Sequence, residues 1–195
     1  AVAEQWVREV LAARDVAPGD CMNGIYLPDV ATGSFTAAGT REQAVVWSCA
    51  ISRVMVHGGL LLLADGRIFA AVDGVYAGAL GALPDINDNG RQEILLRNWY
   101  MGQGIVEDYF SIIELGTGEA RNLGKFAGGV DACDTGRDDV GAEAYRYRVR
   151  PGSEPVYFRQ RLVKDDCESD EWVADDEFVP VSPEIDPPSY PLLGS

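Results

Sequence analysis

The chain has 195 residues, of which 47% are hydrophobic, so it can form a sizeable buried core and extended disorder is not expected. Its formal net charge of −15 argues against a nucleic-acid partner, which would need clustered Lys and Arg, and against an anionic membrane surface. No apolar run approaches the ~18 residues of a membrane-spanning helix, so membrane insertion is not expected either.

The first expected element is a short amphipathic helix over 3–14. Its apolar residues recur at helical spacing, at Trp6, Val7, Val10 and Leu11, and a Pro-Gly pair at 18–19 follows as a stop signal. Beyond it, runs rich in β-branched and aromatic residues predict short antiparallel strands. These runs lie at 43–56, 60–80, 93–100, 105–115, 143–150 and 156–163.

Turn signals join these runs. Asp-Gly pairs at 65–66 and 73–74, a glycine-rich turn at 102–104 and the sequence PGSEP at 151–155 each predict a hairpin. We therefore expect one mainly β domain over 1–164, built of propeller-blade-like repeats or as a degenerate β-sandwich.

The C-terminal part differs in composition. Eight of the thirteen residues at 165–177 are acidic, and the remainder of the chain is rich in proline. Because proline has no N–H to donate, this end is not expected to join a sheet interior. We interpret 165–195 as an extended tail, held by its own domain or by a neighbouring chain.

Four cysteines allow three disulfide pairings. We favour Cys21–Cys49 and Cys133–Cys167, because each pair joins segments that are close in sequence. The alternative is four reduced, buried thiols in a cytosolic protein. Disulfides would indicate a secreted, cell-surface or periplasmic location.

The stretch DINDNGRQE at 85–93 places oxygen-bearing side chains at alternate positions, as calcium loops do. The candidate calcium ligands are the side chains of Asp85, Asn87, Asn89 and Glu93 and the main-chain carbonyl of Arg91. Gly90 allows the sharp turn, but Leu96 stands where an EF-hand has its bidentate Glu, so the loop is not an EF-hand. With only two carboxylates, calcium affinity would be weak, and the alternative is an Asx-rich turn without metal.

This stretch resembles the calcium loops of the FG-GAP and VCBS repeat families, in which a hydrophobic strand follows directly. Two degenerate copies stand at 131–139 and 34–46, so the repeat-like region spans 34–163. In the third copy Gly39 and Glu42 match Gly90 and Glu93. The resemblance implies β-blades with calcium in a loop, and an extracellular structural, adhesive or interaction role.

The chain carries no nucleophile elbow, zinc-protease motif or phosphate-binding loop, so we expect no enzyme. The leading expectation is an extracytoplasmic structural or interaction protein with a calcium-stabilised loop. It would associate with other protein subunits or with itself. The alternatives are a small secreted hydrolase that uses carboxylates, and an inhibitor or ligand-binding module, which an exposed aromatic patch would favour.

Overall fold

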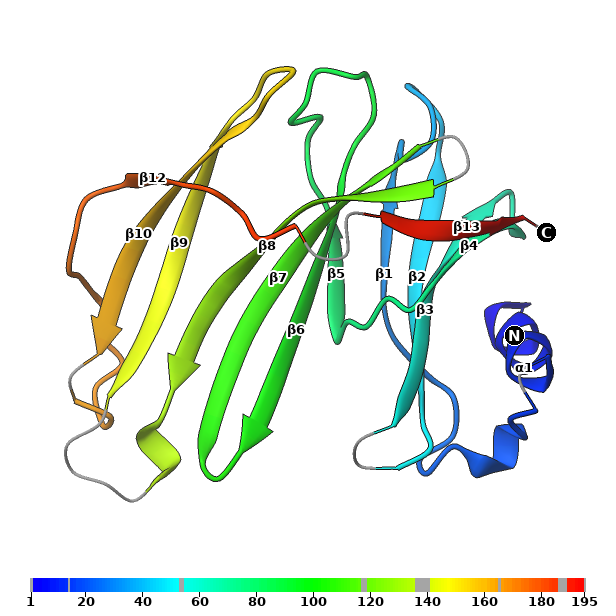
Figure 1. Cartoon of the computed structure of the whole chain (residues 1–195), viewed down its shortest axis with the longest axis horizontal. Coiled ribbons are helices and arrows are strands. Elements are labelled where there is room, and N and C mark those ends of the chain that lie inside the picture. Colours follow the sequence, from blue (N-terminus) through cyan, green and yellow to red (C-terminus); the bar gives the residue numbers. More distant parts are fainter. Residues whose placement is uncertain are drawn as a thin grey trace.

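The structure is a computed structural model, and it describes residues 2–13, 15–52, 55–116, 119–135, 141–164, 166–185 and 189–194. Within these ranges the chain is mainly β, with antiparallel strands and one N-terminal α-helix, as predicted (Figure 1). The elements are α1 (Val2–Ala12), the 3-10 turns η1 (Pro18–Asp20) and η2 (Cys133–Thr135), and the strands β1 (Tyr26–Gly33), β2 (Glu42–Ala50), β3 (Val56–Ala64), β4 (Arg67–Asp73), β5 (Ala79–Ala82), β6 (Ile94–Gly102), β7 (Ile105–Leu115), β8 (Glu119–Asp131), β9 (Ala142–Arg150), β10 (Val156–Lys164), β11 (Val173–Ala174), β12 (Val179–Val181) and β13 (Ser189–Gly194).

The first sheet is an antiparallel meander in the order β1-β2-β3-β4. The β3–β4 hairpin turns at Asp65-Gly66, where both residues have positive φ, 50° and 73°. This backbone matches the right-handed twist of the flanking strands, which explains why the Asp-Gly pair makes the predicted hairpin.

The second Asp-Gly pair does not make the hairpin predicted there. β4 ends at Asp73, and the N–H of Gly74 donates to the carbonyl of Gly58. The chain then crosses to another sheet, where β5 pairs with β6 and not with β4 (Figure 1). The positive φ of Gly74, 74°, serves a change of direction instead of a return.

The second sheet begins with a matching meander, β5-β6-β7-β8, and continues through β9 to β10. The turns at 102–104 and 151–155 are the predicted hairpins. At the first of these, Gln103 and Gly104 both have positive φ, 54° and 79°. β11 and β12 pair with the outer edge of β10.

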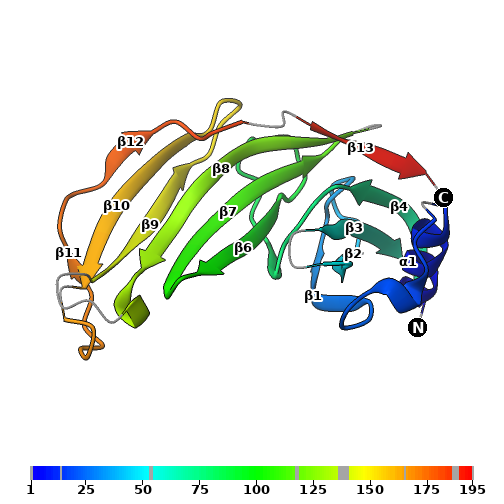
Figure 2. The same ribbon diagram turned by 60° about the horizontal axis from the view of Figure 1, so that its bottom comes forward.

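The C-terminal segment corrects the expectation that it stays outside the sheets. β13 lies between β4 and β8 and so joins the two sheets (Figures 1 and 2). Residues 189–191 pair with β8, and residues 192–194 pair with β4. Because each half of the strand pairs on one side only, Pro191 is accommodated without an N–H to donate.

The interior is divided into three apolar clusters. The central cluster lies between the two sheets and is made by Ala31, Phe35, Ala44, Val46, Leu60, Leu62, Val72, Val75, Ala77, Ile94, Leu96, Ile113, Leu115 and Ala120. A second cluster lies where α1 packs on the other face of the first sheet, with Val7 and Leu11 against Trp47 and Leu61. The third covers the other face of the second sheet, around Phe126.

Both disulfides have the pairing that the sequence favours. Cys21 is bonded to Cys49 of β2, which ties the segment after α1 to the first sheet. Cys133, in η2, is bonded to Cys167, which ties the loop after β8 to the acidic segment. All four cysteines are therefore oxidised in this structure.

Candidate functional site

The predicted calcium loop connects β5 to β6. Both oxygens of the Asp85 carboxylate accept main-chain hydrogen bonds, from the N–H of Asn89 at 3.1 Å and of Gly90 at 2.6 Å. Asp88 and Gly90 have positive φ, 58° and 82°, so the backbone doubles back around the Asp85 side chain. In this conformation the main-chain N–H groups point toward the Asp85 carboxylate. The positive φ at position 90 is one that glycine adopts without strain, which explains the glycine there.

Two side chains inside the loop are buried and only partly satisfied. Asn87 is 8% exposed, and neither its Oδ1 nor its Nδ2 has a hydrogen-bond partner among the described residues. Glu93 is fully buried at 0% exposure; its Oε2 accepts from the N–H of Ile86 at 2.9 Å, whereas its Oε1 has no described partner. Buried polar groups without partners are costly, so these oxygens need an explanation.

The electrostatics of Glu93 follow from this burial. Loss of hydration raises the pKa of its carboxyl to about 7, partly opposed by the hydrogen bond from Ile86 and reinforced by the negative charge of Asp85. An ionised Glu93 is therefore disfavoured in the protein alone. A cation next to Asp85 and Glu93 would favour the ionised form.

The outer side of the loop is tied to β7 and β8 through Glu114. The Asn89 amide and the Arg91 guanidinium both donate to its Oε1, the latter at 2.6 Å. Arg121 of β8 binds its Oε2 through Nη2 at 2.5 Å and Nε at 2.8 Å. Glu114 is buried, so this network fixes the loop against the second sheet. No sequence pattern indicates this network, because Glu114 is an ordinary position near the end of β7.

A second loop, between β1 and β2, has the same internal hydrogen bond. Glu42 matches Glu93 at an offset of 51 residues, and its Oε2 accepts from the N–H of Phe35 at 2.8 Å, again seven residues earlier. Glu42 is also buried. The two loops lie side by side, because the N–H of Gln92 donates to the carbonyl of Ser34 at 2.9 Å.

The two loops differ at the second oxygen of the glutamate. Thr36 stands at the position that matches Asn87, and its hydroxyl donates to Oε1 of Glu42. In the loop at 85–93 the matching contact is missing among the described residues, which leaves Oε1 of Glu93 and Oδ1 of Asn87 both without a partner. The glutamate of the β1–β2 loop is satisfied by protein groups alone, and the glutamate of the loop at 85–93 is not.

The remaining degenerate copy, at 131–139, lies only partly within the described residues, because 136–140 fall outside them. Asp131 accepts a hydrogen bond from the N–H of Cys133 at 3.0 Å, and Cys133 is committed to its disulfide. A sulfur in this bond does not ligate calcium, which prefers oxygen.

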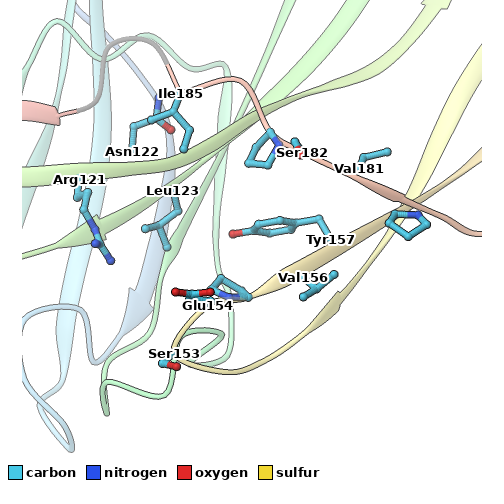
Figure 3. Close-up of a pocket in the computed structure, with 13 residues that line it drawn as sticks. Arg121, Asn122, Leu123, Ser153, Glu154, Val156, Tyr157, Val181, Ser182 and Ile185 are labelled. Carbon is cyan, nitrogen blue, oxygen red and sulfur yellow. The ribbon is translucent and has the colours of Figure 1, made fainter.

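A cavity of about 650 Å³ lies next to the loop at 85–93, between β8, the β9–β10 hairpin and the C-terminal segment (Figure 3). The hairpin turn is bonded to the loop, since the N–H of Gly152 donates to the carbonyl of Ile86. Tyr157 extends from β10 across the cavity, and its buried hydroxyl has no described partner. Burial, with the nearby charge of Glu93, raises the pKa of Tyr157 to about 12.

Of the five predicted ligands, Asp85 and Glu93 supply the two carboxylates, whereas Oδ1 of Asn89 already accepts a hydrogen bond from the N–H of Arg91 at 2.8 Å. In the part of the chain that the structure describes, no cluster of three or more His, Cys, Asp and Glu side chains is placed to hold a metal ion. The orphaned oxygens of Asn87 and Glu93, both near Asp85 in the loop, nevertheless suit a cation that takes neutral and charged oxygen ligands.

Comparison with protein-family models, with curated proteins and with solved structures finds no match to this chain. Among the described helices, none has the length and apolar character needed to cross a membrane.

Proposed function

We propose that this chain is an extracytoplasmic structural or interaction protein whose loop at 85–93 is stabilised by bound Ca²⁺. The ligands would be the side chains of Asp85, Asn87, Asn89 and Glu93 and the carbonyl of Arg91. The bound ion would supply the positive charge that allows Glu93 to ionise in a buried site.

The observation that carries this proposal is the difference between the two matched loops. Oε1 of Glu42 is satisfied by Thr36, whereas Oε1 of Glu93 and Oδ1 of Asn87 have no described partner in an otherwise similar frame. An oxygen-seeking cation satisfies both atoms at once. Two carboxylates give weak binding, with a Kd of the order of 10⁻⁴–10⁻³ M, the range of extracellular modules.

The two disulfides support the extracytoplasmic location, because such bonds persist mainly in oxidising compartments. A calcium site of this affinity is useful only where calcium is abundant, which agrees with the same location. The role that follows is that of a rigid subunit or accessory in a larger assembly.

The carboxylate-dependent hydrolase receives less support. Glu93 is the one carboxylic acid whose pKa is raised among those with a resolved shift in the described residues, and it is enclosed and not presented to a substrate. A ligand-binding module is favoured by a separate observation, a groove with exposed aromatic side chains.

The test is a thermal melt of the whole protein in chelator and in ~10 mM calcium, which is at least about ten times the expected Kd. Ten-fold saturation stabilises by about 1.4 kcal/mol, which corresponds to a rise in Tm of about 3 to 6 °C for a chain of this size. Magnesium at the same concentration should give a smaller rise, because it demands a smaller octahedral site.

Two variants make the test specific. Asp85→Ala removes a carboxylate ligand, so its Tm should not respond to calcium. Asn87→Thr copies the satisfied loop: its hydroxyl should reach Glu93 as Thr36 reaches Glu42, abolishing the calcium response without lowering Tm in chelator. An unchanged Tm of the wild type in calcium would overturn the proposal, as would a full response in both variants.

A further inference from the structure

A groove of about 570 Å³ lies where the start of β1 and the β4–β5 connection meet β6 and β7. None of the described residues that line it is charged. Three of its aromatic rings are strongly exposed: Tyr26 at 60%, Trp99 at 49% and Tyr76 at 46%. A group of exposed rings in a concave surface contributes little to folding and is typical of a binding site, and the volume is in the usual range for small ligands.

The rings are held in place before any ligand arrives. Trp99 lies over Gly78, where an added Cβ would come within 2.1 Å of the indole, so only glycine allows this packing. The side-chain amide of Asn98 bonds to three neighbours. Its Nδ2 donates to the carbonyl of Tyr76 and, at 2.9 Å, to the hydroxyl of Tyr109. Its Oδ1 accepts from the N–H of Trp99. Preorganised rings lose little conformational entropy on binding.

The groove also presents polar groups that are not used within the protein. The hydroxyls of Tyr26, Tyr76 and Ser48 have no hydrogen-bond partner in the described part of the chain, and the Tyr109 hydroxyl can still donate. A hydroxyl both donates and accepts, so the lining matches a ligand that itself carries many hydroxyls.

From this geometry we infer that the groove binds a neutral saccharide. One face of a pyranose ring consists of C–H groups that pack on an aromatic face, and its rim of hydroxyls meets polar groups that donate and accept. The lack of charged side chains among the described lining residues and the net charge of −15 disfavour anionic sugars. A proline-rich peptide also docks on aromatic grooves, but its carbonyls only accept and would leave the accepting capacity of the groove unused.

This inference does not depend on the calcium loop, since none of the groove residues belongs to it. The experiment is isothermal titration of the whole protein, in calcium and in chelator, with neutral hexasaccharides of glucose, xylose, mannose and N-acetylglucosamine. A uronic-acid hexasaccharide and a proline-rich decapeptide serve as comparison ligands. We expect at least one neutral saccharide to bind, and neither comparison ligand to bind comparably.

Three groove variants and one control locate the binding. Trp99→Ala and Tyr26→Ala should each weaken it at least about ten-fold, which corresponds to 1.4 kcal/mol. Gly78→Ala should weaken it as well, because it displaces the indole without removing any ring. Trp172→Ala removes a comparably exposed tryptophan outside the groove and should leave binding unchanged.

The rings removed in Trp99→Ala and Tyr26→Ala are about half exposed or more, so these two variants should remain folded, and a melt of each verifies this. Absence of binding for every neutral saccharide would overturn the inference. It would also be overturned by binding that survives Trp99→Ala, or by a decapeptide that binds in the wild type and is lost in Trp99→Ala, which would assign the groove to peptides.

Discussion

At the scale of single residues, Glu93 combines complete burial with an ionisable group. Its carboxyl is fully buried, accepts one hydrogen bond from Ile86 and keeps one oxygen without a described partner. The same residue type at position 42 is satisfied entirely by protein groups. An ionisable group in such a site makes stability depend on pH in a way that can be measured.

The pKa of Glu93 is raised from its usual 4.5 to about 7, so the folded state binds more protons than the unfolded state between these values. The stability that this residue contributes is therefore fully present below about pH 4.5, falls as pH rises from 4.5 to about 7, and stays at the lower level above that. We predict that Glu93→Gln, melted in chelator, gains Tm relative to the wild type as pH rises from about 5 to 8.

In calcium the order should reverse at the higher pH, because the variant lacks a charged ligand. Comparing the variant with the wild type at each pH removes the contribution of the other titrating groups. A difference in Tm that stays constant from acid to neutral pH would contradict the raised pKa.

Glu114 is a second position at which one side chain should contribute strongly to the free energy of unfolding. It is buried and receives donors from Asn89, Arg91 and Arg121. We predict that Glu114→Ala lowers the free energy of unfolding by about 3 to 5 kcal/mol, because it leaves a partly buried arginine uncompensated. Urea denaturation measures this; Glu4→Ala, whose partner Arg8 is exposed, should cost much less, because an exposed ion pair is screened by solvent.

At the scale of elements, the six-residue strand β13 is important for stability because it joins the two sheets. It pairs with β8 at 189–191 and with β4 at 192–194. We predict that replacing 189–194 with a Gly-Ser segment of equal length lowers Tm and causes concentration-dependent association, because β4 and β8 then present open edges. Differential scanning calorimetry and light scattering test this, and an unchanged Tm would mean that the pairing contributes nothing.

Sequence patterns predicted some elements well and missed others, for physical reasons. The run at 105–115, rich in β-branched and aromatic residues, is β7 to the residue; Ile113 packs in the central cluster and Ile112 in the third, so apolar side chains contact both faces. β8 was missed because its glycines weaken the strand signal. At least one of these glycines is required by a contact with another strand. A Cβ at Gly129 would lie 2.4 Å from the carbonyl oxygen of Glu143 on β9. No local pattern contains that contact.

The same limit applies to the turns and to the candidate site. An Asp-Gly pair specifies a local bend but not the direction that the chain takes afterwards. The hairpin predicted at 65–66 is therefore confirmed, and the hairpin predicted at 73–74 is wrong. The five proposed ligands in the loop at 85–93 are predicted from spacing alone. Glu114 does not, because it is contributed by a strand distant in sequence, and the exposed rings of the groove come from segments that no spacing rule connects.

At the scale of the whole molecule, the two disulfides stabilise different regions. Their sequence separations, 28 and 34 residues, are similar, so loss of either should cost about 3 to 4 kcal/mol from the unfolded chain alone. We predict that Cys21→Ala/Cys49→Ala costs more than Cys133→Ala/Cys167→Ala, because both sulfurs of the first pair are buried beneath α1 and their removal leaves a void.

Guanidinium denaturation of the two double variants measures the difference. A larger loss for the second pair would show that the acidic segment, and not the packing beneath α1, depends more on its crosslink.

The bridging position of β13 also determines when the fold can be completed. The two meanders consist of strands that follow one another closely in sequence, so each can form from local contacts. β13, however, must find partners at 70–72 and at 119–121, which were synthesised long before it. Such distant pairings form slowly. Until they do, the edges of β4 and β8 in each molecule remain available to β13 of a neighbour. Rapid synthesis at high concentration therefore favours molecules that exchange β13.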